Sequence, residues 1–343
     1  MAIQMQTKTV TVAEAINEAI RLEMRRNPRV ILMGEDIAGG ATLPHLEDDE
    51  AWGGVLGVTK GLVQEFGRER VRDTPLSEAG YMGAAVGAAA TGLVPIAELM
   101  FCSFIGSCMD SMLNQASKIR YMFGGKANIP IVIRTIIGGG FRAAAQHSMV
   151  LYPIFAHIPG LKVVAPSNPA DMKGLLTAAL RDGNPVFVCE HLAMYQLKGE
   201  MPEGEYVVPI GQAAVTRTGK DVTIVGASMT ARYALAAAEE LAKDGIDAEV
   251  VDLRTISPLD ENTILESVAK TGRLVIADEA NPVCGLATHV AGVVASKGFS
   301  SLRAPVGLVT PPHSPVPFSP VLEDAYLPNP EKIVAAARAV CVK

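Results

Sequence analysis

Apolar runs of strand length alternate with helical segments along most of this chain, and this alternation constrains the fold more than any other feature. Three such runs occupy residues 29–36 (RVILMGED), 94–100 (VPIAELM) and 129–140 (IPIVIRTIIGGG). Residues 11–28 have the apolar spacing of a helix after a capping threonine. Strands that alternate with helices indicate a parallel sheet covered on both faces. We therefore predict an α/β fold.

The alternation stops in residues 191–209, where Pro and Gly appear and hydrophobic periodicity is lost, and it resumes afterwards. The length of 343 residues also suits two domains, since one domain takes about 150 residues. We predict a first α/β domain over residues 1–190, a linker over 191–209, and a second, smaller α/β domain over 210–343.

Composition limits the kinds of partner. Hydrophobic residues make up 49% of the chain and charged residues only 19%, so we expect much surface to be buried against other chains. The net charge of −6, with no Lys/Arg cluster, argues against nucleic acid as a partner. Residues 79–97 carry no charge but contain four glycines and Pro95, which favours a buried helix over a membrane span.

The cysteines indicate the compartment. All five are scattered and none has CxxC spacing, which is typical of buried thiols in a reducing environment. The first twenty residues lack the apolar core and cleavage site of a signal peptide. We expect a cytoplasmic protein.

Several common catalytic motifs are absent from the sequence. It has no GxGxxG after the first strand, no GxxxxGK[ST], no HExxH and no GxSxG. These absences argue against a Rossmann dinucleotide site, a P-loop, a catalytic zinc and a serine hydrolase.

Two acids and a histidine remain as candidates, because each follows a predicted strand. Glu35 lies at the end of the first strand. Glu78 is the one charged residue in the stretch 74–93. His147 follows a glycine-rich loop after a third strand. The carboxyl ends of parallel strands are where α/β proteins hold ligands. Each residue also has a structural interpretation, because an acid near a helix start stabilises the helix by about 0.3–1 kcal/mol and a loop histidine often only satisfies local hydrogen bonds.

Several motifs that occur in order along the chain resemble those of one known family. Residues 73–98 (DTPLSEAGYMGAAVGAAATGLVPIAE), 121–134 (YMFGGKANIPIVIR) and 159–176 (PGLKVVAPSNPADMKGLL), with RAAAQHS and RDGNPVF, resemble the β subunits of the thiamine-diphosphate-dependent 2-oxo acid dehydrogenases. The resemblance covers nearly the whole chain. It implies that the first domain is a thiamine-diphosphate pyrimidine-binding domain and that the second is similar to the transketolase C-terminal domain.

The resemblance also implies roles for individual residues. Glu78 matches the catalytic acid that hydrogen-bonds the aminopyrimidine ring of the cofactor. Glu35, Leu76 and Phe104 match residues near or against that ring. His147 matches a catalytic histidine that faces the reacting centre and helps to bind substrate or steer acyl transfer.

Metals and partners follow from the same comparison of motifs. The turn AALRDGNP resembles one whose carbonyl oxygens hold a structural potassium ion in some relatives, with Ala179, Leu180, Asp182 and Asn184 as the matching residues. Members of this family that bind the diphosphate do so through Mg²⁺ and a GDG motif followed some residues later by Asn, and GDG does not occur here. A separate α subunit is therefore expected to supply the Mg²⁺ and diphosphate ligands within an α2β2 heterotetramer, and a lipoyl acyltransferase is expected to accept the product.

The expected reaction follows from a loop. Residues 45–67 (HLEDDEAWGGVLGVTKGLVQEFG) are most similar to acetoin-cleaving members of the family. This implies cleavage of acetoin to acetaldehyde and a hydroxyethyl unit that passes as acetyl to lipoamide. The alternatives are a pyruvate or branched-chain 2-oxo acid substrate and, in a different class, a non-catalytic subunit that only docks an acyltransferase.

Overall fold

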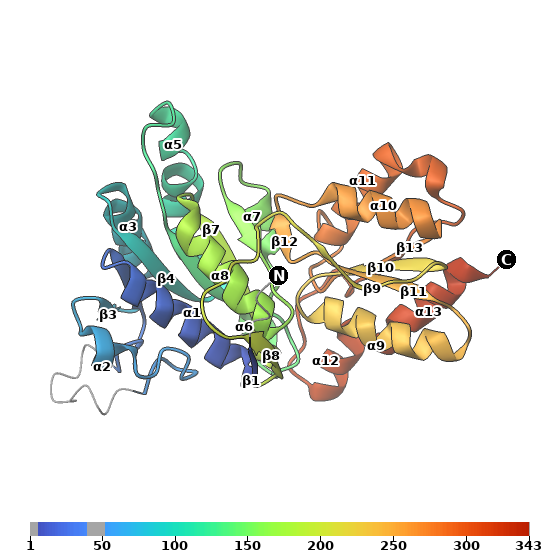
Figure 1. Ribbon diagram of the computed structural model, residues 1–343, viewed down its shortest axis with the longest axis horizontal. Helices are drawn as coiled ribbons and strands as arrows, with labels where there is room; N and C mark the ends of the chain where they lie inside the picture. Colours follow the sequence, from blue (N-terminus) through green and yellow to red (C-terminus); the bar gives the residue numbers. More distant parts are fainter. Residues whose placement is uncertain (1–5, 40–51, 343) are drawn as a thin grey trace.

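A seven-stranded sheet forms the centre of the first of two lobes in the computed structural model, which describes residues 6–39 and 52–342 (Figure 1). Neighbouring strands are parallel except at one edge, where β12 runs antiparallel to β6. The strands lie in the order β12 (Thr255–Ser257), β6 (Lys162–Val164), β7 (Val186–His191), β5 (Val132–Ile137), β4 (Val94–Phe101), β2 (Val30–Gly34) and β3 (Val71–Asp73).

Helices cover both faces of this sheet, as the alternation predicted. Val30 and Leu32 pack in the cluster that holds α1 and α8, whereas Ile31 and Met33 pack in the cluster that holds α3, α4 and α7. Successive residues of a strand point to opposite faces, so β2 is buried on both sides. The helices are α1 (Val12–Arg26), α8 (Pro169–Asp182), α3 (Glu78–Ala90), α4 (Ile105–Asp110) and α7 (Tyr152–Ala156).

Local sequence explains where α1 begins. The Thr11 side chain accepts a hydrogen bond from the Glu14 backbone N–H, and the Glu14 carboxylate accepts from the Thr11 N–H. This reciprocal capping box satisfies donors that a helix start leaves without partners. The helical stretch between β4 and β5 is not one continuous α-helix. A π-helical segment, η3 (Ser111–Ala116), separates α4 from α5 (Ile119–Met122), and Cys108 leaves helical geometry with φ −124°.

The second lobe contains a five-stranded sheet with β9 as its one antiparallel strand. Helices α9 and α13 pack on one face, and α10 and α11 pack on the other. The strands lie in the order β14 (Gly307–Val309), β13 (Leu274–Ala277), β10 (Val222–Gly226), β11 (Ala248–Asp252) and β9 (Ala214–Arg217). The helices are α9 (Met229–Lys243), α13 (Pro330–Cys341), α10 (Glu261–Thr271) and α11 (Leu286–Lys297), with α12 (Pro320–Tyr326) beside the first lobe.

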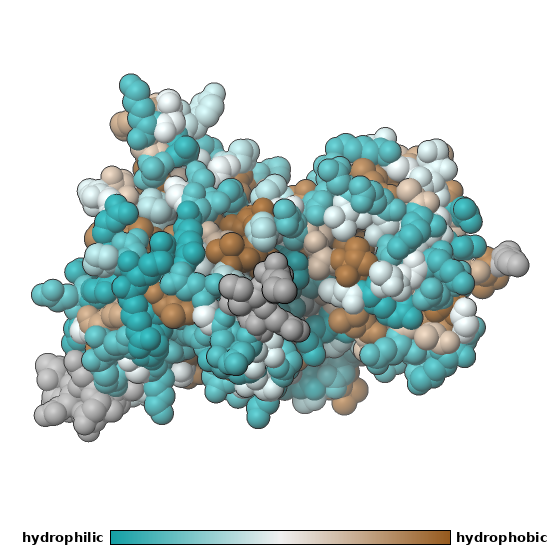
Figure 2. Space-filling model, in the orientation of Figure 1, coloured by the Kyte–Doolittle hydropathy of each residue, from teal (hydrophilic) through white to brown (hydrophobic). Residues whose placement is uncertain are grey.

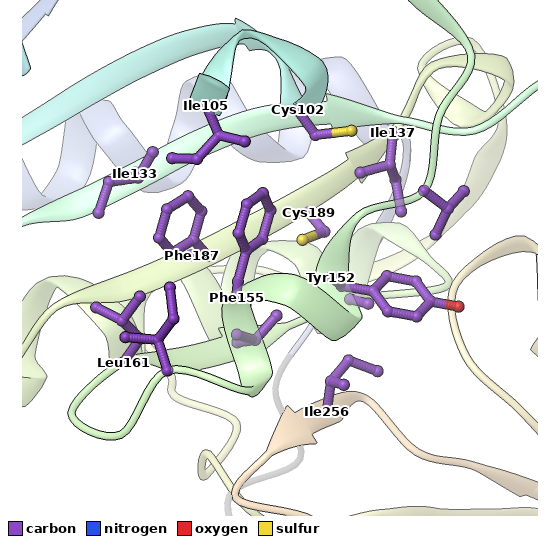
Figure 3. Close-up of a cluster of buried hydrophobic side chains, with 14 of the residues drawn as sticks. Cys102, Ile105, Ile133, Ile137, Tyr152, Phe155, Leu161, Phe187, Cys189 and Ile256 are labelled. Carbon is purple, nitrogen blue, oxygen red and sulfur yellow. The ribbon is translucent and has the colours of Figure 1, made fainter. Parts of the chain in front are cut away.

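One hydrophobic cluster continues from the first lobe into the second. Phe155 and Phe187 stack with ring centroids 4.1 Å apart, and Ile256 of β12 belongs to the same cluster (Figure 3). Tyr152 lies among these side chains and donates a hydrogen bond to Asp278 of the second lobe. The two lobes therefore share a core.

The surface and the thiols agree only in part with expectation. The face in Figure 2 is mainly hydrophilic, with apolar side chains in small patches. Among the described residues no helix has the length and apolar character that crossing a membrane requires. All five cysteines are free. Cys102, Cys108 and Cys189 are buried as expected, but Cys284 is exposed and Cys341 is half-buried, so the expectation of buried thiols is wrong for these two.

Part of the stretch predicted as a linker packs directly on other elements. Its strand β8 (Lys198–Pro202) pairs antiparallel with β1 (Thr7–Thr11). Farther on, the Val208 backbone N–H donates to the Gly174 carbonyl of α8 at 3.1 Å. A Cβ on Gly174 would lie 2.5 Å from Cγ2 of Val208, so α8 and this segment are in close contact.

We expect Gly174→Ala to lower the free energy of unfolding by about 1–3 kcal/mol, because the added methyl overfills this contact. Gly87→Ala in α3 is the matched control, since its Cβ would meet no described atom within 4 Å. The greater helix propensity of alanine than of glycine should raise the free energy of unfolding of this control by up to about 1 kcal/mol. Urea denaturation of both variants measures the difference, and equal effects would contradict the close contact.

Candidate active site

The carboxyl ends of four neighbouring strands gather the residues predicted to form the site. The strands β5, β4, β2 and β3 are consecutive in the sheet and parallel. Glu35 follows β2, Leu76 and Glu78 follow β3, and Phe104 follows β4. His147 ends α6 (Ala144–His147), which follows β5. All five residues therefore stand at one edge of the sheet.

Glu35 is the most unusual acid at this edge. Only 5% of the residue is exposed, and within the described part of the chain its Oε1 has no hydrogen-bond partner. Burial, together with the nearby charges of Glu78, Asp36 and Glu98, raises the pKa of Glu35 to about 7. A carboxyl group with this pKa can hold or release a proton near neutral pH.

Glu78 is the first residue of α3. It lies near Glu35, because its charge contributes to the raised pKa of that carboxyl group. It is half-buried, so in this chain by itself it is less enclosed than an acid in an apolar wall would be. Burial, with a further contribution from the Glu78 charge, raises the pKa of the Cys108 thiol to about 12. Leu76 is 83% exposed just before α3 and offers a bare apolar surface next to the two acids.

An aromatic cluster holds His147. Its ring lies 4.6 Å from the Phe101 ring and 5.8 Å from the Phe104 ring, measured between centroids, and both contacts are edge-to-face. The Ser103 hydroxyl donates to the Gln146 carbonyl at 2.6 Å, next to the histidine in the chain. Sequence reasoning missed Phe101 and Ser103, although both stand in the motif FCSF that contains Phe104.

A buried ionic network joins the strands below this cluster. The Arg134 guanidinium on β5 donates to both carboxylate oxygens of Glu190 on β7, at 2.7 and 2.8 Å, and to Glu98 on β4 at 2.6 Å. The Tyr195 hydroxyl donates to Glu190 at 2.6 Å. Burial raises the pKa of Glu98 against the opposing effect of Arg134. The lone arginine in the apolar run 129–140 was the signal in the sequence for this network.

The predicted potassium ligands lie elsewhere. Their turn ends α8 and enters β7 at its amino end, which is the opposite edge of the sheet from His147. There the Lys162 ammonium pairs with Asp182 at 2.5 Å, and the Asn184 amide donates to the Asp182 carboxylate at 2.8 Å. Ala179 and Leu180 are buried in the last turn of α8, where helix carbonyls lack partners within the helix. In the described ranges no cluster of three or more His, Cys, Asp or Glu side chains is suited to hold a metal ion.

Two family models match the chain. The transketolase pyrimidine-binding domain matches residues 8–198, and the transketolase C-terminal domain matches residues 211–333. A solved structure described as a split-gene transketolase, an inactive β4 tetramer, superposes with a TM-score of 0.76 over 97% of this chain and 98% of its own. At 23% identity this likeness shows the fold.

Curated relatives are more similar in sequence. The β subunit of the acetoin:2,6-dichlorophenolindophenol oxidoreductase of Bacillus subtilis is 60% identical over 96% of both chains. The subunit of that name from Cupriavidus necator is 58% identical over 96% of this chain and 97% of its own. The pyruvate dehydrogenase E1 component subunit β of Rhizobium meliloti is 45% identical over 98% of this chain and 70% of its own.

The raised pKa of Glu35 makes stability depend on pH. Its pKa rises from 4.5 to about 7 on folding, so between these values the folded chain holds a proton that the unfolded chain has released. The free energy of unfolding therefore falls as pH rises through this window. The free energy of unfolding of Glu35→Gln, relative to that of the wild type, should therefore increase by about 1–3 kcal/mol from pH 5 to pH 8.

Chemical denaturation of both proteins at the two pH values measures this gain. The control is Glu261→Gln, which changes an exposed salt bridge with Lys297. If the stability difference between Glu35→Gln and the wild type is the same at both pH values, Glu35 titrates normally.

Proposed function

Because this chain belongs to the family of β subunits of the thiamine-diphosphate-dependent 2-oxo acid dehydrogenases, we propose that it is the β subunit of the thiamine-diphosphate-dependent component of acetoin dehydrogenase. The observation that carries this choice is the higher identity to two acetoin oxidoreductase β subunits than to a pyruvate dehydrogenase subunit. Part of the loop that resembles acetoin-cleaving members, residues 45–51, lies outside the described residues.

The residues at the sheet edge fit the aminopyrimidine of the cofactor. That ring is flat, with apolar faces and polar edges. The side chains of Leu76 and Phe104 offer apolar surface, and Oε1 of Glu35, which has no partner among the described residues, offers a hydrogen-bond acceptor or donor. We assign Leu76, Phe104, Glu35 and Glu78 to hold this ring.

Each side chain has a definite task in this proposal. The Glu78 carboxyl group shares a proton with a ring nitrogen, and enclosure by the partner subunit would strengthen this hydrogen bond by excluding water. Glu35, whose pKa is about 7, can hold a proton beside Glu78 and so limits the negative charge next to the ring. His147 faces the reacting centre from the aromatic cluster and orients the substrate or the acyl acceptor. When bound, thiamine diphosphate supplies the nucleophilic carbon and accommodates the electrons of the cleaved bond.

The chain forms one side of the site in this proposal. Its sequence lacks the GDG motif, so an α subunit supplies the Mg²⁺ and diphosphate ligands in an α2β2 heterotetramer. A lipoyl acyltransferase accepts the acetyl group. The carbonyl oxygens at the end of α8 hold a structural potassium ion. The protein acts in the cytoplasm, where its five free thiols would stay reduced. A subunit that only docks an acyltransferase would have no use for a buried carboxyl oxygen, Glu35 Oε1, that has no hydrogen-bond partner among the described residues.

Reconstitution with the α subunit tests the substrate. With an artificial electron acceptor, kcat/KM for acetoin should exceed that for pyruvate by about tenfold or more, the discrimination that a few specific contacts provide. Either subunit alone should be inactive. Higher kcat/KM for pyruvate would favour a pyruvate dehydrogenase subunit, and cofactor binding without turnover of acetoin, pyruvate or branched-chain 2-oxo acids would favour a docking role.

Glu78→Gln tests the proton-sharing acid. The amide keeps the size and one hydrogen bond but cannot share a proton, so exchange of the reactive cofactor hydrogen with deuterated solvent should slow by about 10²–10⁴-fold. The measurement is NMR on the α/β complex with calorimetry to establish that cofactor remains bound. Glu261→Gln is the control, and an exchange rate within about threefold of the wild type would remove Glu78 from this role.

A further inference from the structure

The loop that carries His147 has an unusual backbone. Gly138 and Gly140 have φ values of 93° and 86°, and the non-glycine residues Arg142 and Ala144 both have φ 59°. Left-handed conformations are unfavourable for residues with a Cβ and persist only when their surroundings enforce them. The loop therefore requires contacts that hold it, and α6 is too short to supply them.

Two acids of the second lobe provide these contacts. The Gly139 N–H donates to Glu279 Oε1 at 2.6 Å, and the Gly140 N–H donates to Glu323 Oε1 at 2.8 Å. The Arg142 guanidinium donates to the other oxygen of Glu323 at 2.6 Å. Two carboxylates from the opposite lobe thus bind three residues of the loop, Gly139, Gly140 and Arg142, and we call Glu279 and Glu323 the acid pair.

Burial makes these hydrogen bonds strong. Glu323 is completely buried on α12, and 8% of the Glu279 side chain is exposed. A buried carboxylate without donors costs several kcal/mol, so these acids need the loop donors as much as the loop needs them. The second contact of Arg142, to Asp324 at 2.7 Å, involves a largely exposed acid and contributes little.

The fit leaves the loop little freedom to shift. A Cβ on Gly138 would lie 2.2 Å from Nε2 of His191, and that nitrogen is 2.8 Å from Glu279 Oε2. A Cβ on Gly139 would lie 2.9 Å from the Leu327 side chain. Glycine is required at Gly138 because His191 at the end of β7 lies against the backbone, and at Gly139 because Leu327 of the second lobe lies against it.

The far end of the loop reaches the aromatic cluster. The Gly138 N–H donates to the Met149 carbonyl at 3.1 Å, so the two ends of the loop are joined. Between them, Ser103 binds the Gln146 carbonyl, and the His147 ring packs on Phe101. The loop is therefore fixed by the second lobe on one side and by the end of β4 on the other.

We infer that the acid pair, Glu279 and Glu323, are positioning residues that hold the loop so that His147 faces the reacting centre. This inference rests on the proposed function, because it gives the position of His147 its importance. The second lobe then contributes to the reaction through contacts with a loop of the first lobe, without reaching the substrate itself.

Glu323→Gln in the reconstituted α/β complex tests the inference. The glutamine amide would direct a donor at Arg142 or at Gly140, each of which is itself a donor, so one hydrogen bond to a charged group is lost. Hydrogen exchange of the amides in residues 138–147 should become about tenfold faster, since such a bond is equivalent to about a factor of ten in the opening equilibrium. The kcat for acetoin should fall by about tenfold while KM changes little, because the displaced His147 side chain acts in the transition state.

Glu249→Gln is the matched control. Glu249 is also a buried glutamate of the second lobe, accepts from the Gly219 N–H and pairs with Lys270, but it contacts no residue of the loop. Loop exchange and kcat should stay at wild-type values in this variant. Arg142→Gln is the second test variant, because 36% of its side chain is exposed and the substitution is compatible with folding.

The outcomes separate the two hypotheses. If Glu323→Gln folds, its combination with Arg142→Gln should be less than additive in loop exchange and in kcat; if it does not fold, Arg142→Gln alone decides. Unchanged loop exchange, or a lower kcat without faster exchange, would overturn the positioning role. Unchanged kcat in His147→Ala would instead refute the proposed role of the histidine, whereas the exchange data would still report whether the acid pair holds the loop.

Discussion

The pairing of one buried arginine with two carboxylates fixes the strands on which the site is built. Arg134 bridges Glu98 on β4 and Glu190 on β7 from its own strand β5. Loss of one partner from such a network leaves an uncompensated buried charge and costs about 3–5 kcal/mol. Phe104 and His147 lie in the segments that follow β4 and β5, and His191 is the last residue of β7. Their relative positions therefore depend on an interaction that none of them makes.

The second lobe has a larger part in the site than its sequence suggests. It contributes no residue to the set first expected at the sheet edge, yet its acids bind the loop before His147. The His191–Glu279 contact joins the end of β7 to the same place. The geometry of the edge is thus set jointly by the central sheet of one lobe and by the residues around α12 of the other.

The sequence was sufficient for the features that depend on local patterns. The alternation predicted parallel sheets covered by helices, and the capping threonine, Thr11, predicted the start of α1. The rule that parallel strands end at one edge was enough to bring Glu35, Glu78 and His147 together. Two features could not be predicted from the sequence: the antiparallel strand β12, which comes from the second half of the chain, and the Glu35 oxygen that has no partner in the part of the chain that the structure describes. Both depend on contacts between segments far apart in sequence, which periodicity does not report.

The strand β12 also has a consequence for how the chain can be divided. Family boundaries fall near residue 200, but β12 completes the first sheet by covering the edge of β6. Arg254, just before it, binds the Asp171 carboxylate of α8 at 2.8 and 3.0 Å. A fragment that ends at the family boundary would have an open sheet edge and a buried acid, Asp171, without its ion pair, and open edges recruit other strands. The evolutionary module and the cooperative folding unit therefore have different limits in this protein.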